Sequence, residues 1–242
     1  MLISTELKKI SNSLASECRN LRFGSHVAAV YNPLEYAKEP HKIYLELAGS
    51  TTKKVIFLGL NPGPWGMAQT GIPFGEIAVV RDWLGIEAAV YKPEREHPKR
   101  PIEGFACARS EVSGRRLWGL FRERFGTSEK FFRGHFVANY CPLVFMNEGG
   151  ANITPDKLPA NETESLFKIC DLALIDTIKL LKPQWVIGIG GFAKKRIDSV
   201  SEVSGAKFFS AQILHPSPAN PRANAGWKED VLKTLIELGV WK

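Results

Sequence analysis

Three apolar, strand-like runs in this chain each lead to a polar side chain that could take part in chemistry. They are residues 55–60 followed by Asn61, residues 135–139 ending on Asn139, and residues 208–214 followed by His215. If these runs are neighbouring strands of one parallel sheet, all three side chains emerge at the same sheet edge, where ligands bind in open α/β sheets. Two carboxamides and an imidazole, without a carboxylate or lysine at these positions, predict a pocket that reads a flat, neutral, polar group through hydrogen bonds.

The segment 59–75 begins at the end of the first run and contains five glycines and three prolines among its seventeen residues. Glycine permits close backbone approach and proline fixes φ, so this composition indicates a rigid loop that could hold Phe74 against a ligand. A surface turn rich in helix and strand breakers is the alternative interpretation. The segment contains neither a phosphate-binding G-x-x-x-x-G-K motif nor a dinucleotide G-x-G-x-x-G motif, which argues against a nucleoside triphosphatase.

The segment 214–227 carries prolines at 216, 218 and 221 and predicts a stiff, protruding turn with His215 at its root. Such a turn could enter a groove or a base stack as a narrow wedge. The carboxamide of Asn139 offers a donor and an acceptor side by side, which complements the O4 and N3–H edge of uracil or thymine. Structural roles remain open for both residues: a packed histidine, and an asparagine that caps the next turn.

The elements that must position these residues follow from hydrophobic spacing and capping signals. Helices are expected over 4–22, 36–47 and 76–84, from a cap at Ser113, from a capping box at Asn161 to Pro183, and over 223–238, with a fourth strand at 185–189 and a short helix after it. Residues 87–111 carry three prolines and predict an irregular excursion. Strands that alternate with helices predict an α/β fold: a three-layer α/β/α sandwich with a central, mostly parallel four-stranded sheet in a single domain, residues 1–242.

The formal net charge of +7 and the pI near 9.2 favour a polyanionic partner. An ordinary solvated surface also explains dispersed charge, although basic residues concentrate at 92–100 and 114–124. The four cysteines are scattered without a C-x-x-C pair, so free buried thiols, no metal site and no cofactor are expected. No apolar run approaches the length of a membrane span, which predicts an intracellular protein without membrane contact.

Four blocks, residues 59–75, 81–85, 139–143 and 215–218, closely resemble the single-strand-selective monofunctional uracil-DNA glycosylases of the uracil-DNA glycosylase superfamily. The resemblance runs in chain order over nearly the whole sequence. It implies the α/β/α fold of the superfamily. It also implies hydrolysis of the N-glycosidic bond of uracil and 5-hydroxymethyluracil in single- and double-stranded DNA, by base flipping and without a lyase step.

Carried over by position, the resemblance assigns a role to each candidate residue. Asn61 resembles the residue that positions the attacking water, His215 the one that stabilises the departing base, Asn139 the amide that reads uracil, Phe74 the ring that stacks on it, and Leu60, Gly63 and Met67 the remaining lining of the base pocket. The DNA-contacting residues would come from segments 149–161 and 215–229: Asn152, Thr154, Pro216, Ser217, Pro218, Ala219, Asn220, Pro221 and Arg222.

Three positions depart from the pattern of vertebrate members. Leu60 and Trp65 stand for methionine and phenylalanine, which are apolar exchanges, whereas Ala219 replaces a larger basic residue in the wedge. The small side chain leaves open how the space of a flipped base is filled, and predicts weaker processing of duplex than of single strands.

The expected partner is DNA that contains uracil or oxidised pyrimidines, and the expected state is a monomer in the cytoplasm and nucleoid of a bacterium or in the nucleus of a eukaryote. A catalytically silent nucleic-acid-binding module with the same fold is the main alternative. Hydrolysis of free nucleosides fits less well, because the sequence lacks an aspartate cluster that could hold a metal and a ribose.

Overall fold

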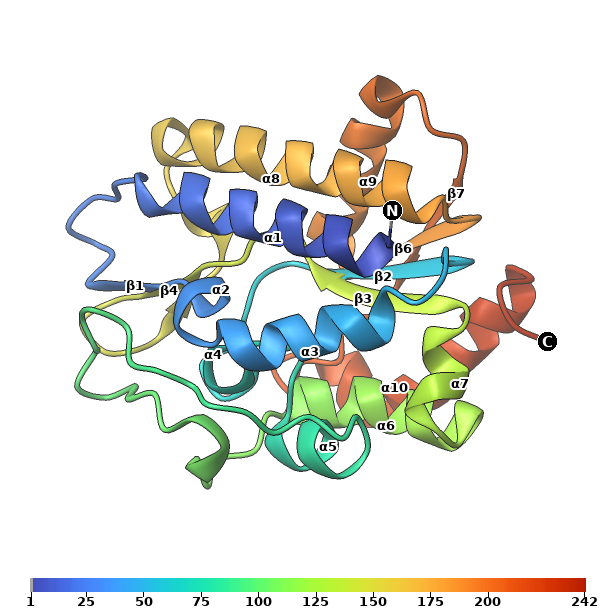
Figure 1. Ribbon diagram of the computed structural model, residues 1–242, viewed down its shortest axis with the longest axis horizontal. Helices are drawn as coiled ribbons and strands as arrows, with labels where there is room; N and C mark the ends of the chain where they lie inside the picture. Colours follow the sequence, from blue (N-terminus) through green and yellow to red (C-terminus); the bar gives the residue numbers. More distant parts are fainter. Residues whose placement is uncertain (1) are drawn as a thin grey trace.

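A parallel four-stranded sheet lies at the centre of the computed structural model, which describes residues 2–242 (Figure 1). Its strand order is β3-β2-β6-β7, and every neighbouring pair is parallel. The strands are β2 (Val55–Gly59), β3 (His135–Asn139), β6 (Trp185–Ile189) and β7 (Phe209–Ile213). The register sets Gly59 opposite Asn139 and Ile189 opposite Ile213, so the carboxyl ends of the strands are level.

Helices cover both faces of this sheet, as expected when parallel strands are joined by crossover connections. In Figure 1, α1 (Ile3–Arg19) and α8 (Ala160–Leu181) lie together on one face, and α6 (Val112–Phe125) and α10 (Pro221–Glu237) lie on the other. The central residues Ile56, Phe57 and Leu58 of β2 are almost fully buried between these layers. The sequence prediction of a three-layer α/β/α sandwich is therefore confirmed.

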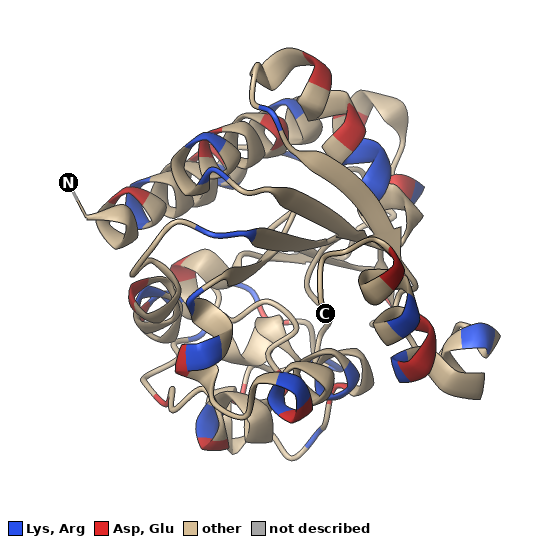
Figure 2. Cartoon of the chain, turned by 90° about the vertical axis from the view of Figure 1, so that its right-hand side faces the viewer, with Lys and Arg blue, Asp and Glu red and all other residues tan. Residues whose placement is uncertain are grey.

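Charged residues lie on the outer helices and loops, with both signs interspersed, while the central sheet is free of them (Figure 2). None of the four central strands contains Asp, Glu, Lys or Arg. No helix in residues 2–242 is long and apolar enough to cross a membrane. The four cysteines are buried free thiols, as predicted.

A second, antiparallel sheet that the sequence did not reveal lies beyond the carboxyl ends of the parallel strands, at the left of Figure 1. It consists of β1 (Ala29–Tyr31), β4 (Val144–Met146) and β5 (Asn152–Ile153), in the order β1-β4-β5. Strands of two or three residues are too short for a periodic pattern. The short helices α2 (Pro33–Tyr36) and α4 (Met67–Thr70) lie on the same side of the molecule.

The remaining helices are α3 (Lys38–Ala48), α5 (Ile77–Asp82), α7 (Ser128–Phe132) and α9 (Gly191–Ser204). The sequence did not predict α7, and α9 has 14 residues where a short helix was expected. Two 3₁₀ turns, Gly104–Ala106 and Pro155–Lys157, complete the regular structure.

Two predicted helix caps are wrong. Helix α6 begins at Val112, and Ser113 is buried inside its first turn because its side chain packs inward instead of meeting solvent at the helix end. Helix α8 follows Pro159, and no side chain caps it, so the capping box expected at Asn161 does not form. Pro159 disfavours helical backbone at the residue before it, so the helix begins at Ala160 and Asn161 lies inside its first turn.

Candidate active site at the carboxyl edge of the sheet

The ends of β2 and β3 bring the first two candidate residues to one edge. Pairing continues past the strands, because Tyr140 N donates to Gly59 O at 2.9 Å and Cys141 N donates to Leu60 O at 2.8 Å. Asn61 and Asn139 therefore leave adjacent strand ends.

Gly59 allows Phe74 and Asn139 to come together over the end of β2. A Cβ atom on Gly59 would lie 2.4 Å from Asn139 Oδ1 and 2.5 Å from Phe74 Cε2, so no larger residue fits. Phe74 itself has a positive φ of 54°, a conformation that costs free energy and occurs most often at functional sites. The indole of Trp118 holds this strained segment by donating from Nε1 to Pro73 O at 3.1 Å.

The carboxamide of Asn139 is only partly satisfied. Its Nδ2 donates weakly to Met67 Sδ at 3.3 Å, and its Oδ1 is buried without a hydrogen-bond partner. A buried acceptor without a partner is costly, and a ligand that donates to it recovers that cost.

His215 follows β7 and lies beside Phe74. Its ring centroid is 6.1 Å from that of Phe74, and Gly190, with a φ of 91°, passes behind its Cβ. Burial lowers the pKa of His215 to about 4, so the ring is neutral near pH 7. Since Nδ1 accepts the amide N–H of Ser217 at 3.1 Å, the proton of the neutral ring is on Nε2.

Asn61 is half-buried at the carboxyl edge of the sheet, and a hydrogen bond to a backbone carbonyl orients its side chain. Its Nδ2 donates to Leu143 O at 3.2 Å, with a longer approach of 3.5 Å to Pro62 O. The amide nitrogen is therefore used by the protein, and Oδ1 is the atom left to accept a hydrogen bond from a ligand or a water.

The turn after His215 is held by hydrogen bonds to neighbouring segments and is partly exposed. Arg116 Nη1 donates to Pro216 O at 3.1 Å, and Asn224 Nδ2 donates to Pro218 O at 2.8 Å. Asn220 begins α10 by accepting from Arg222 N at 3.1 Å. The exposed part of the turn consists of Pro218, Ala219, Pro221 and Arg222, with Ser217 half-buried and Pro216 buried.

The other predicted DNA-contacting residues, Asn152 and Thr154, lie in or just after β5. They belong to the small antiparallel sheet and not to the strand ends that carry Asn139 and His215. The predicted site residues therefore lie in two places, at the carboxyl ends of the parallel strands with the turn that follows His215, and at β5 with the residues just after it.

Comparison with known proteins agrees with this geometry. Residues 48–236 match the Uracil DNA glycosylase superfamily. The single-strand selective monofunctional uracil DNA glycosylase of Bos taurus is 48% identical over 227 residues, which cover 94% of this chain and 84% of the bovine protein. The Rattus norvegicus protein of the same description is 47% identical over 227 residues, 94% of this chain and 82% of the rat protein.

The chain belongs to the uracil-DNA glycosylase superfamily. A crystal structure of wild-type Pedobacter heparinus SMUG2 shares the fold, with a TM-score of 0.65, 16% identity and coverage of 96% of this chain and 97% of that one. The family resemblance inferred from the four sequence blocks is confirmed.

Glu111 is a feature of this superfamily member that the sequence analysis missed. Its carboxyl group lies against the glycine-rich loop, because a Cβ atom on Gly66 would be 2.5 Å from Oε2 and one on Gly63 would be 3.4 Å from Oε1. Burial, together with the nearby carboxyl of Glu76, raises the pKa of Glu111 to about 7. A glutamate at the end of a proline-rich, irregular segment carries no pattern from which this contact could be predicted.

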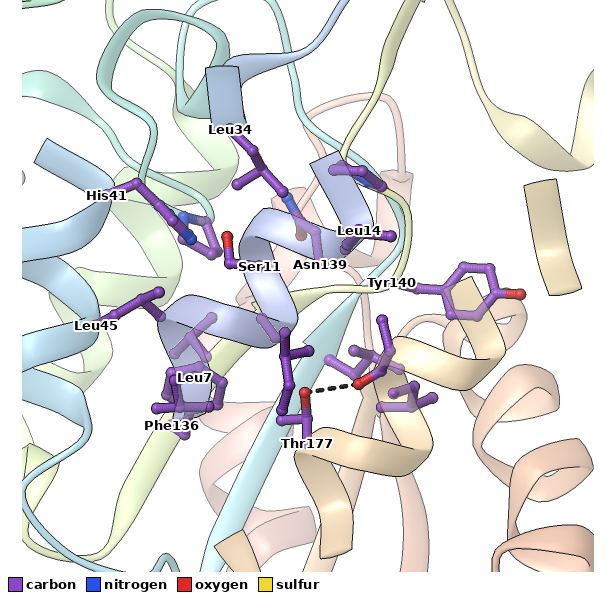
Figure 3. A pocket seen from close by; sticks show the side chains of 18 of the residues that line it. Leu7, Ser11, Leu14, Leu34, His41, Leu45, Phe136, Asn139, Tyr140 and Thr177 are labelled. Carbon is purple, nitrogen blue, oxygen red and sulfur yellow. Dashed lines mark hydrogen bonds between the residues drawn. The ribbon is translucent and has the colours of Figure 1, made fainter. Parts of the chain in front are cut away.

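An apolar hollow of about 80 Å³ lies behind Asn139 (Figure 3). Leu7, Leu14, Leu45 and Phe136 surround it, and Asn139 stands at its edge. Thr177 lies beside it with its hydroxyl bonded to Ala173 O at 2.7 Å. The lining also includes Met67, and it includes neither Phe74 nor His215.

No group of three or more His, Cys, Asp or Glu side chains in residues 2–242 is arranged to hold a metal ion.

Proposed function

We propose that this chain is a monofunctional DNA glycosylase of base excision repair that hydrolyses the N-glycosidic bond of uracil in DNA. The observation that carries the proposal is the buried, unpartnered Oδ1 of Asn139 beside Phe74 and His215. The relatives at 46–48% identity are described as single-strand selective monofunctional uracil-DNA glycosylases, which supports the same activity here.

Uracil complements the carboxamide. Its N3–H would donate to Oδ1 of Asn139, and its O4 would accept from Nδ2 in place of the weak contact with Met67. Cytosine presents the opposite pattern, an acceptor at N3 and a donor at N4, and would leave Oδ1 and N3 facing each other. Phe74 supplies the ring on which an extrahelical base would stack.

Cleavage of the glycosidic bond leaves positive charge on the sugar and negative charge on uracil O2. A donor aimed at that oxygen lowers the barrier selectively because the oxygen gains charge only as the bond breaks. In this proposal the neutral His215 donates from Nε2–H to O2, and Oδ1 of Asn61 holds the water that attacks the sugar carbon. The sugar cation is strongly electrophilic, so the water needs placement more than deprotonation.

Further parts of the proposal concern substrate range and DNA contact. Leu60, Gly63 and Met67 would border the 5-position of the base, where space would admit the hydroxymethyl group of 5-hydroxymethyluracil. The turn 216–222, together with Asn152 and Thr154, would contact DNA in single and double strands, with Ala219 too small to fill the place of a flipped base. Residues 1–242 would act as one monomeric domain in the compartment that holds DNA.

The test is release of uracil from a single-stranded oligonucleotide under single-turnover conditions. Asn61→Ala and His215→Ala should each slow release by about 10²–10³-fold, the scale for loss of one preorganised hydrogen-bonding group, while DNA affinity changes much less. Thymine and cytosine in the same sequence position serve as control bases.

Three outcomes would contradict the proposal. Absence of release by the wild-type chain, with DNA binding intact, would favour the catalytically silent binding module. Near-normal release by both variants would exclude the roles assigned to Asn61 and His215. Faster cleavage of free deoxyuridine than of the oligonucleotide would point to a nucleoside hydrolase.

A further inference from the structure

Trp65 lies in the glycine-rich loop and carries two stacked guanidinium groups. Arg100 Cζ is 5.1 Å and Arg109 Cζ is 5.3 Å from the centroid of the Trp65 ring. Trp65 is half-buried between Gly63 and Gly66, in the stretch that leads from Asn61 to Met67. Both arginines come from the irregular excursion 87–111, to which the proposed chemistry assigns no part.

The backbone that carries Arg100 is fastened to the body of the protein. Tyr31 Oη donates to Arg100 O at 2.7 Å and accepts from His97 N at 2.6 Å. The fully buried Gln69 donates from Nε2 to Pro101 O at 3.0 Å and to Pro64 O at 3.1 Å, which joins the excursion to the glycine-rich loop. Because these hydrogen bonds fix the backbone of the segment, its side chains are held in defined positions.

The same segment also adjoins the second loop that was predicted to contact DNA. A Cβ atom on Gly150 would lie 3.2 Å from Lys99 Cβ, and His97 Nε2 is 3.2 Å from Glu148 O. The stretch 97–100, which carries Arg100, therefore lies against residues 148–150 at the start of that segment.

The two guanidinium groups are not neutralised by the protein. Within residues 2–242, neither Arg100 nor Arg109 takes part in an ion pair. Arg100 donates from Nη1 to Lys99 O at 2.8 Å, and its Nε is buried without a hydrogen-bond partner within residues 2–242. Arg109 is exposed. Of the two acids that flank Arg100 in sequence, Glu96 is bound by Lys92 and by Ile102 N, and Glu103 takes part in no ion pair within residues 2–242.

A guanidinium stacked on an indole keeps the N–H groups at its edge free. Those groups match the oxygens of a phosphodiester, which arginine binds in a bidentate manner. We propose that Arg100 and Arg109, held on Trp65, form a phosphate clamp that binds the DNA backbone beside the extrahelical nucleotide. This inference rests on the proposed function, because it takes the same DNA strand as its ligand.

The clamp is tested by measuring the affinity for a single-stranded oligonucleotide that carries uncleavable 2′-fluoro-deoxyuridine, over a range of salt concentrations. Arg109→Gln and Arg100→Gln should each weaken binding about three- to tenfold and reduce the salt slope by about 0.7, the loss expected for one phosphate contact on a single strand. Trp65→Ala should approach the effect of the double arginine variant, and Trp65→Phe should have a smaller effect.

Arg133→Gln is the matched control. It removes the same charge from an exposed residue in the turn before β3, at the opposite edge of the sheet. The control should change neither affinity nor salt slope by more than its general effect on net charge. Because Arg109 is exposed, Arg109→Gln tests the clamp without disturbing the fold.

A scan of single methylphosphonate linkages then locates the contact. At one or two linkages next to the uracil analogue, the neutral linkage should weaken binding of the wild type and have little further effect in the double arginine variant. Equal salt slopes for the clamp variants and the control would exclude the proposed clamp. So would a scan in which every neutral linkage affects the wild type and the double arginine variant alike. Either result would stand even if the wild type releases uracil. Failure of the wild type to release uracil from the natural oligonucleotide would overturn the proposed function instead.

Discussion

His135 and His215 lie at opposite ends of the central sheet. Their rings differ in how many of the two nitrogen atoms are hydrogen-bonded by the protein. Burial lowers the pKa of each ring to about 4. At the amino end of β3, both nitrogens of His135 are used: Nδ1 donates to Phe131 O at 3.1 Å, and Nε2 accepts from Trp241 Nε1 at 3.0 Å. At the carboxyl end of β7, Nδ1 of His215 accepts a hydrogen bond from Ser217 N, and Nε2 takes part in no hydrogen bond within residues 2–242.

The surroundings of the two rings follow the same division. His135 packs among Phe57, Phe125, Phe131 and Trp241, with ring centroids 4.7–6.1 Å away. His215 has one aromatic neighbour, Phe74, which borders the candidate base pocket. The histidine at the amino end of the sheet therefore serves packing, whereas the histidine at the carboxyl end keeps a neutral N–H donor available to a ligand.

The largest expected effect that would test this comparison is on stability at the amino end. His135→Ala should lower the free energy of unfolding by roughly 3–4 kcal/mol, because it removes a buried ring and leaves the N–H of Trp241 without its acceptor. Denaturant unfolding would measure this change, and His215→Ala should cost less than about 1 kcal/mol in the same experiment. Equal losses in the two variants would show that His215 is also a packing residue.

Next in size is the effect of a substitution at the carboxyl end that replaces none of the functional side chains. Gly59→Ala puts a methyl group 2.4 Å from Asn139 Oδ1 and 2.5 Å from the Phe74 ring. Displacing these groups by about 1 Å should slow uracil release by roughly 10²-fold. Gly119→Ala, within α6 where a Cβ meets nothing within 4 Å, is the matched control and should release uracil at the wild-type rate. Normal release by Gly59→Ala would mean that close approach at this strand end is not required.

The carboxyl edge was predictable from the sequence because each of its parts has a local signal. Continuous apolar runs predicted β2, β3, β6 and β7, and parallel strands bring the residues that follow them to one edge, which placed Asn61, Asn139 and His215 correctly. Contacts between distant segments have no such signal. The positions of Glu111 against Gly66, of Arg100 and Arg109 on Trp65, and of the short strands β1, β4 and β5 depend on tertiary packing, so only the structure reveals them.

A third and smaller effect concerns the buried carboxyl that underlies the pocket loop. The pKa of Glu111 is raised from 4.5 to about 7, so the folded protein holds a proton that the unfolded chain releases. Its contribution to stability is present below pH 4.5 and is lost as the pH rises through about 7. Glu111→Gln, which stays neutral, should therefore gain stability relative to wild type as the pH rises from 5 to 8, by about 1–3 kcal/mol. A difference between the two proteins that does not change over this range would show that Glu111 is ionised normally.

The smallest expected change, and the sharpest test of the comparison, is in the protonation of the two rings. The hydrogen-bond partners require opposite tautomers: His135 must carry its proton on Nδ1 to donate to Phe131 O, whereas His215 must carry it on Nε2 because Nδ1 accepts from Ser217 N. Since the pKa of each ring is lowered to about 4, both should remain neutral from pH 5 to 8, and nitrogen NMR should show one signal pattern of each tautomer without titration. Uracil release should then show no step assignable to His215 in this range. If His215 titrates near its usual pKa of 6.5, or carries its proton on Nδ1, it cannot be the neutral Nε2–H donor to uracil O2, and stabilisation of the departing base would have to come from an imidazolium or from another group.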